Sequence, residues 1–157
     1  MKTVKKIGIY LFVFFVLVQL SGCVWFTHHY EFSQDADHVA RVDIYRCEND
    51  EDDLEMVPIC VLDGSLTEQF LADIVALDSY EYFGDFSHTF AGVLVYITYE
   101  NGEGEVLTAY TTAKVDLNGK WHVGVDHFDE SAFYSVILKY VDPALVPELE
   151  QHNEELQ

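Results

Sequence analysis

Seven histidines supply the imidazole nitrogens that could bind a transition metal. They are His28, His29, His38, His88, His122, His127 and His152. No two of them have the i, i+4 spacing that puts both imidazoles on one face of a helix, as in HExxH, and no group of Cys and His has structural-zinc spacing. The histidines therefore do not predict a specific metal centre.

Carboxylates are densest in residues 48–55, where six of the eight side chains are acidic. Calcium prefers such hard oxygen ligands, which makes Asp50, Asp52 and Asp53 the candidate cation ligands. The segment lacks the Asp-x-Asp-x-Asp-Gly spacing and the later bidentate Glu of a calcium loop. We therefore expect a diffuse cloud of cations around an exposed loop rather than a cage.

Nucleophilic catalysis needs a serine or cysteine beside a base, and the chain has no Gly-x-Ser-x-Gly elbow. Carboxylate pairs suited to glycoside hydrolysis are easily found among 28 acidic residues, so finding them carries no information. Gly102, Glu103 and Gly104 do not make a phosphate loop, because glutamates surround them and no helix follows. We expect neither enzyme activity nor a cofactor.

Aromatic residues gather in residues 80–90, where Glu81 and Asp85 add negative charge. Aromatic side chains are enriched in the cores of protein interfaces, and the two acids would suit a basic partner. The alternative is that most of these rings cover the open edge of the core. The candidate partner-binding residues are Tyr80, Tyr82, Phe83 and Phe86.

The first 22 residues have the composition of a secretion signal. Lys2, Lys5 and Lys6 form a basic segment, and an apolar stretch follows over residues 7–20. An apolar run of about 14 residues is too short to cross a hydrocarbon core of about 30 Å as a helix, so it fits a cleavable signal. No later segment is long and apolar enough to span a bilayer. We therefore expect the rest of the chain on the outer side of the membrane.

The signal ends in Leu20, Ser21, Gly22 and Cys23, and these four residues resemble the lipobox of bacterial membrane lipoproteins. The resemblance implies that Cys23 receives a diacylglyceryl group, becomes the first residue of the mature chain and is N-acylated. Two or three acyl chains on one residue anchor a protein stably. An ordinary secretory signal that ends near a cysteine is the alternative.

Residues 39–141 look like small uncharacterised lipoproteins of Gram-positive bacteria, through the Tyr-Glu-Asn-Gly-Glu turn and the segment Phe-Tyr-Ser-Val-Ile-Leu-Lys-Tyr. This resemblance implies anchoring at the cell membrane. In a Gram-negative cell, Val24 in place of aspartate after the lipidated cysteine would imply the outer membrane instead.

Cleavage before Cys23 removes three lysines and no acidic residue, which takes the formal charge from −20 to −23. Binding to nucleic acids or anionic lipids relies on Lys and Arg to neutralise phosphates. We therefore exclude nucleic acid as a partner. The charge can attract a basic protein or cations, or only keep the chain soluble.

Cys47 and Cys60 remain after this processing, and an even pair in an exported protein indicates a disulfide. Closing a loop of about 14 residues would stabilise the fold by about 3 kcal/mol. A metal pair or free thiols are the alternatives, and neither has supporting ligands nearby.

Alternating apolar and polar side chains predict a strand around residues 40–45, and a second strand follows at residues 56–62. Pro58 marks an edge strand, because proline cannot donate to a ladder. The two strands are expected to form a hairpin around the acidic loop.

Two further turns predict hairpins. Asn101 and Gly102 indicate a two-residue turn that sets Ile97 opposite Val106, followed by a long strand over residues 105–116 that bends near its middle. The next turn has three residues and ends in a left-handed Gly119. This turn sets Val115 opposite Trp121.

Two helices are expected. The first begins at Ser65, which forms a capping box with Glu68. The second is capped by Asp129, carries Phe128 as a hydrophobic staple, and ends before Pro143.

This order of elements predicts an α+β domain over residues 38–142, in which an antiparallel sheet of about five or six strands has two helices packed on one face. Residues 23–37 are expected to be the lipidated cysteine and a tether, and residues 143–157 an acidic, frayed tail.

The expected function is that of a lipid-anchored, extracytoplasmic and non-catalytic acidic module that meets a basic protein or a cell-wall component. A narrower version is an immunity or inhibitor protein against a basic secreted hydrolase. A surface cation-binding protein and an extracytoplasmic enzyme are the remaining alternatives.

Overall fold

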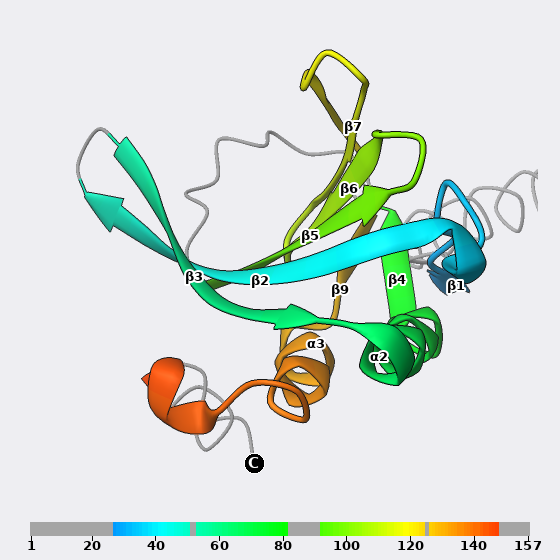
Figure 1. Ribbon diagram of the computed structural model, residues 1–157. Helices are drawn as coiled ribbons and strands as arrows, with labels where there is room; N and C mark the ends of the chain where they lie inside the picture. Colours follow the sequence, from blue (N-terminus) through cyan, green and yellow to red (C-terminus); the bar gives the residue numbers. More distant parts are fainter. Residues whose placement is uncertain (1–26, 51–52, 82–91, 125, 148–157) are drawn as a thin grey trace, which may run out of the picture.

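The computed structural model describes residues 27–50, 53–81, 92–124 and 126–147, with side chains outside residues 48–54 (Figure 1). The strands are β1 (Thr27–His29), β2 (Val39–Asp50), β3 (Asp53–Leu62), β4 (Asp78–Glu81), β5 (Gly92–Tyr99), β6 (Gly104–Leu107), β7 (Thr112–Val115), β8 (Trp121–Val123) and β9 (Asp126–Phe128). The helices are α2 (Gly64–Val75) and α3 (Glu130–Ile137), with 3-10 turns η1 (Ala36–His38) and η2 (Pro143–Leu145).

All strand pairs are antiparallel, and they form two sheets. The larger sheet has six strands in the order β3-β2-β5-β6-β7-β8, and the smaller has three in the order β1-β4-β9. Helices α2 and α3 lie side by side beneath the large sheet (Figure 1). The predicted α+β class with a sheet of about six strands is confirmed.

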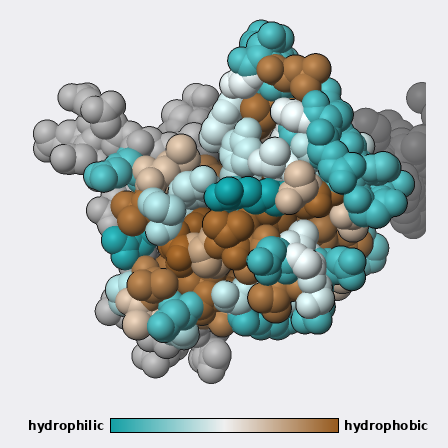
Figure 2. Space-filling model, in the orientation of Figure 1, coloured by the Kyte–Doolittle hydropathy of each residue, from teal (hydrophilic) through white to brown (hydrophobic). Residues whose placement is uncertain are grey.

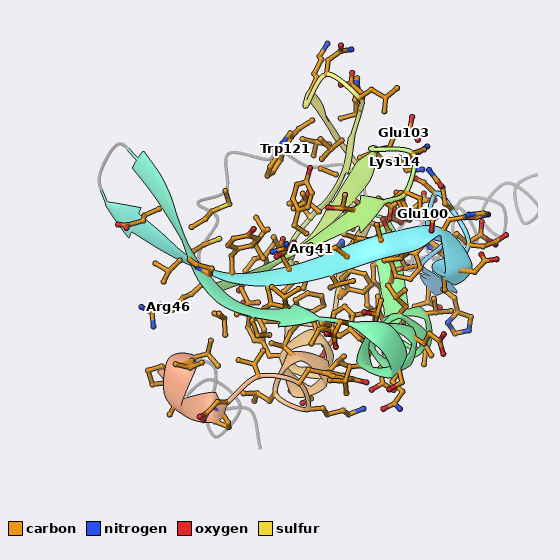
Figure 3. All side chains as sticks on the ribbon, in the orientation of Figure 1. Arg41, Arg46, Glu100, Glu103, Lys114 and Trp121 are labelled. Carbon is orange, nitrogen blue, oxygen red and sulfur yellow. The ribbon has the colours of Figure 1, made fainter. Side chains whose placement is uncertain are left out.

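The large sheet has apolar side chains on both faces, because successive strand residues point to opposite sides. Val42 and Ile44 belong to the main core, which the helices cover. Leu94 and Val106 belong to a second, smaller cluster, with Trp121 packed against it. Figure 3 shows Trp121 on the side of β2 away from the helices.

Several large apolar side chains are exposed at the surface. Met56 and Val61 of β3 and Leu66 and Val75 of α2 are all at least 40% exposed. In Figure 2 hydrophobic residues gather over the middle of the face below β2, whereas the surface toward the β7–β8 hairpin is mostly hydrophilic. No helix in the described part of the chain is long and apolar enough to cross a membrane.

Strands β2 and β3 form the predicted hairpin, and β3 with Pro58 is an edge strand as expected. The acidic segment differs from the prediction, because the ladder continues through it to the pair Asp50 and Asp53. Backbone pairing in a hairpin does not require the side chains to be buried, so a run of charges does not prevent a strand. The loop is shorter than its composition indicates.

Cys47 and Cys60 are not bonded to each other in this structure, and the disulfide between them stays a prediction. Cys47 lies opposite Met56, and Cys60 lies opposite Ile44. The two cysteines are thus offset along the hairpin by about 10 Å, since each residue advances a strand by about 3.3 Å. Cys47 joins the second cluster and Cys60 packs against the main core, so their side chains point to opposite faces. A disulfide needs Cα atoms no more than about 7 Å apart.

The β5–β6 hairpin is shifted by one residue from the prediction. Its loop has three residues rather than two, and Gly102 adopts a left-handed φ of 89°. Asn101 stabilises this loop, because its side-chain oxygen accepts the Glu103 N–H at 2.9 Å. A one-residue shift moves every side chain to the other face of the sheet. Glu105, rather than Val106, therefore lies opposite Ile97 in the main core.

The long strand predicted over residues 105–116 is two strands. It turns back at residues 108–111, where the Thr108 N–H and hydroxyl both donate to the Thr111 carbonyl oxygen. Strands β6 and β7 therefore pair with each other. The next turn is confirmed, with Val115 opposite Trp121 and Gly119 at a φ of 75°.

Helix α3 confirms its predicted start, because Asp129 accepts the Ala132 N–H and the Phe128 ring stacks on Phe133. Helix α2 differs, since it begins one residue before Ser65 and its N-cap residue, Asp63, makes no side-chain capping bond. The described residues 143–147 of the predicted tail also differ, because Pro143–Leu145 form η2 and Val146 is fully buried in the core.

The prediction of a tether is wrong from Thr27 onward. β1 pairs with β4, and Tyr30 is buried in the main core. Glu105 attaches the segment to β6, because its two carboxylate oxygens accept the Tyr30 hydroxyl at 2.9 Å and the Ser33 N–H at 2.5 Å. The domain therefore begins at or before Thr27, and the separation between it and Cys23 is short.

Candidate functional site

A pocket of about 310 Å³ opens at the end of the small sheet, and we call it the tyrosine–carboxylate pocket. It is lined by Tyr80, Tyr110, His127, Phe128, Asp129 and Glu130. Its volume is near the lower limit of about 300 Å³ for ligand pockets, which suits a single side chain or a small head group.

Four elements position the lining residues. Tyr80 belongs to β4 and lies opposite His127 of β9. Tyr110 sits on the tight turn between β6 and β7, and the Phe128 N–H ties this turn to β9 by donating to the Ala109 carbonyl oxygen at 2.9 Å. Asp129 and Glu130 start helix α3. The pocket therefore forms where both sheets meet the helix.

Carboxylates give the pocket its charge. The Tyr110 hydroxyl donates a short hydrogen bond to Glu130 Oε1. Burial and the adjacent Glu130 raise the pKa of Tyr110 to about 12. Burial and the nearby Tyr110 and Glu130 also raise the pKa of Tyr134. Both phenols thus stay neutral donors, and none of the lining residues is a lysine or arginine that could balance Asp129 and Glu130.

His127 adds an uncharged wall to the pocket. Burial lowers the pKa of its imidazole, which favours the neutral ring near pH 7. The ring lies 5.5 Å from the Tyr80 ring, centroid to centroid, at an interplanar angle of 32°. The two rings present aromatic surface beside the carboxylates, and the almost fully buried Phe128 completes the lining.

Ser79, His28 and Asp126 lie next to the pocket and carry the residue types of a catalytic triad. His28 Nε2 is 2.7 Å from Asp126 Oδ1. The fully buried Ser79 hydroxyl, however, donates to the His28 carbonyl oxygen at 2.8 Å, not to its imidazole. This geometry fastens β1 to β4 and does not activate the serine as a nucleophile.

A second groove, of about 520 Å³, lies between residues 30–36 and helix α2. Apolar residues such as Phe32, Leu71 and Val75 line it, with Glu31 and Glu68 beside them. The tyrosine–carboxylate pocket is the better candidate, because its polar groups converge and its Tyr110–Glu130 contact is already formed.

Of the candidate partner-binding residues, Tyr80 lies in the pocket, while Tyr82, Phe83 and Phe86 lie outside the described residues, as do Cys23 and Asp52. Asp50 and Asp53 belong to the β2–β3 ladder. Within the described residues, no three His, Cys, Asp or Glu side chains are grouped to hold a metal.

Sequence reasoning missed Tyr110, His127 and Glu130. The only local signal was the Asp129 cap, which marks the start of a helix with the charged Glu130 in its first turn. Tyr110 reaches Glu130 only because the chain turns back at residues 108–111, which the sequence pattern did not indicate.

No protein-family model, no curated protein and no solved structure matches this chain.

Proposed function

We propose that this protein is a lipid-anchored, extracytoplasmic interaction module whose tyrosine–carboxylate pocket binds a lysine or arginine side chain of a basic protein. The observation that carries the proposal is the pocket itself, where aromatic rings and carboxylates converge on a space of about 310 Å³.

A basic side chain satisfies both features of the pocket. Its cationic group is attracted to the faces of tyrosine rings, by about 0.5–2 kcal/mol depending on how far it is desolvated. Glu130 and Asp129 can accept its N–H donors, and its methylene stem can pack on the Tyr80 and His127 rings. An acidic ligand would instead face like charges.

The charge of the whole chain supports the same partner. The formal charge is −20, or −23 without the three signal lysines, so long-range attraction would speed the approach of a basic protein. The pocket adds what diffuse charge lacks, which is a defined position for one side chain.

Replacing Glu130 by Gln is expected to weaken binding of a fluorescein-labelled lysine–glycine peptide by about 5-fold, because one charge is lost from the pocket at about 1 kcal/mol. The side-chain amide oxygen of the variant can still accept the Tyr110 hydroxyl, so the fold should persist. The measurement is fluorescence anisotropy on the soluble Cys23→Ser chain, at two salt concentrations.

The matched control is Glu100→Gln, which changes the net charge equally on the exposed β5–β6 turn (Figure 3). It should alter the affinity by less than about 2-fold, since exposed pairs contribute little. Equal effects of the two variants would show that only the overall charge attracts the peptide, and the pocket would be excluded.

Anchoring through Cys23 is tested separately. The Cys23→Ser variant is expected to leave the membrane fraction completely and to appear in the soluble secreted fraction, because no acyl chain can be attached. Fractionation and mass spectrometry of the mature N-terminus measure this. A variant that stays membrane-bound would contradict the proposed lipid anchor.

A further inference from the structure

The strand register places the pocket beside the N-terminal end of the described chain. Thr27 of β1 lies opposite Tyr80 of β4, and Tyr80 lies opposite His127 of β9. Neighbouring strands are about 5 Å apart, so the Cα atoms of Thr27 and His127 are separated by about 10 Å. Both Tyr80 and His127 line the pocket.

The chain between this sheet and the proposed lipid is short. Only Val24, Trp25 and Phe26 separate Cys23 from Thr27. Fully extended, these steps span at most about 14 Å from Cys23 to Thr27. Trp and other aromatic residues favour the membrane interface, so this sequence does not pull the domain away from the bilayer.

β1 cannot detach easily to lengthen this separation. His28 bonds to Asp126 of β9, and Tyr30 and Ser33 are both held by the buried Glu105. The span of about 14 Å from Cys23 to Thr27 and the separation of about 10 Å from Thr27 to His127 add up to about 24 Å. The Cα atom of His127, in the wall of the pocket, is therefore within about 24 Å of the Cys23 Cα atom. The proposed lipid on that residue would lie in the bilayer.

We infer that the tyrosine–carboxylate pocket works at the membrane surface, and that its partner is a basic protein segment held at that same surface, such as one that flanks a membrane-spanning helix. This inference rests on the proposed function, both for the anchor and for the basic ligand.

Two physical arguments favour such a partner. When both molecules are held on one membrane, binding becomes effectively intramolecular and the apparent affinity can rise by about 100-fold or more without new contacts. Basic residues are also depleted from the short outer loops of membrane proteins, so a basic segment there is an uncommon and therefore selective signal.

The test uses the lipidated chain in zwitterionic vesicles, which remove attraction and repulsion by anionic lipids. A lysine–glycine peptide is attached to a lipid head group through a short or a long linker, or left free in solution. A carbodiimide then joins lysine amines to nearby carboxylates, and mass spectrometry identifies the carboxylates that react.

The short-linked peptide is expected to couple to Glu130 or Asp129 at about a 100-fold lower concentration than the free peptide. The soluble Cys23→Ser chain should show no such gain. Coupling that occurs only with the long linker, or that reaches Glu100 instead of the pocket, would show that the pocket faces away from the membrane and would overturn the inference.

Different results are expected if the proposed function itself is wrong, rather than the position of the pocket at the membrane. If the free peptide coupled to Glu130 no better than to Glu100 in the soluble chain, the pocket would not bind basic side chains at all. If the chain that retains Cys23 did not associate with vesicles, the proposed lipid anchor would be wrong.

Discussion

The Glu105→Ala variant is expected to lose about 3–5 kcal/mol of folding free energy, because the buried Tyr30 hydroxyl and the part-buried Ser33 N–H both lose their acceptor. A buried donor left unpaired costs about 1–3 kcal/mol, the part-buried Ser33 N–H adds less, and the missing side chain also leaves a cavity. Glu105 is fully buried. Since a domain of this size has a stability of about 5–15 kcal/mol, the loss would be a large fraction of the total.

Urea unfolding followed by circular dichroism measures this loss. Glu103→Ala is the matched control, because Glu103 lies two residues away on the half-exposed turn, where its carboxylate accepts a part-buried hydrogen bond from Gln34 and an exposed one from Asn101. We expect this control to change the stability by less than about 1 kcal/mol. Tyr30→Phe should fall between the two, since it removes one donor and leaves one acceptor unpaired.

The buried Glu105 carboxylate also affects the pKa values of the tyrosines around it. Burial and the adjacent Glu105 raise the pKa of both Tyr30 and Tyr99, so these phenols stay protonated in the folded chain. Equal stability of Glu105→Ala and Glu103→Ala would contradict the assignment of Glu105 as the attachment point of residues 27–35.

The Phe133→Ala variant is expected to lose about 3–5 kcal/mol, as is usual when a buried aromatic ring is removed. Phe133 is fully buried, stacks on Phe128 with ring centroids 5.3 Å apart, and contacts the Tyr134 ring edge-on at 6.0 Å. Its loss would release the start of α3 from β9. Because Phe128 lines the pocket, peptide binding should weaken as well.

Chemical unfolding again provides the measurement, with Ser135→Ala as the control. Ser135 is exposed on the same helix, so its replacement should change the stability by no more than about 0.5 kcal/mol. A loss below about 1 kcal/mol for Phe133→Ala would show that helix α3 does not depend on the staple.

Local patterns in the chain were sufficient for much of the architecture. The Asp129 cap, the Phe128 staple and the left-handed Gly119 were all predictable, because each depends on residues within a few positions of one another. The same holds for the β2–β3 hairpin with Pro58 at the sheet edge. Together they define an α+β fold.

Register and long-range contacts were not predictable in this way. A two-residue and a three-residue turn at Asn101 are both compatible with the local sequence, yet they place Glu105 on opposite faces of the sheet. The choice depends on partners far along the chain, since Tyr30 and Ser33 satisfy the carboxylate only after the N-terminal segment packs on β6.

The pocket depends on the same kind of information. Its residues come from β4, β9, a turn and the start of α3, and no spacing in the sequence links Tyr80, Tyr110 and Glu130. The predicted secretion signal and the lipobox resemblance, by contrast, are read from 23 consecutive residues. Local patterns thus predict both helices and several of the strands, and they carry the proposed export signal. The position of the candidate binding site follows instead from packing between distant segments, which local patterns do not encode.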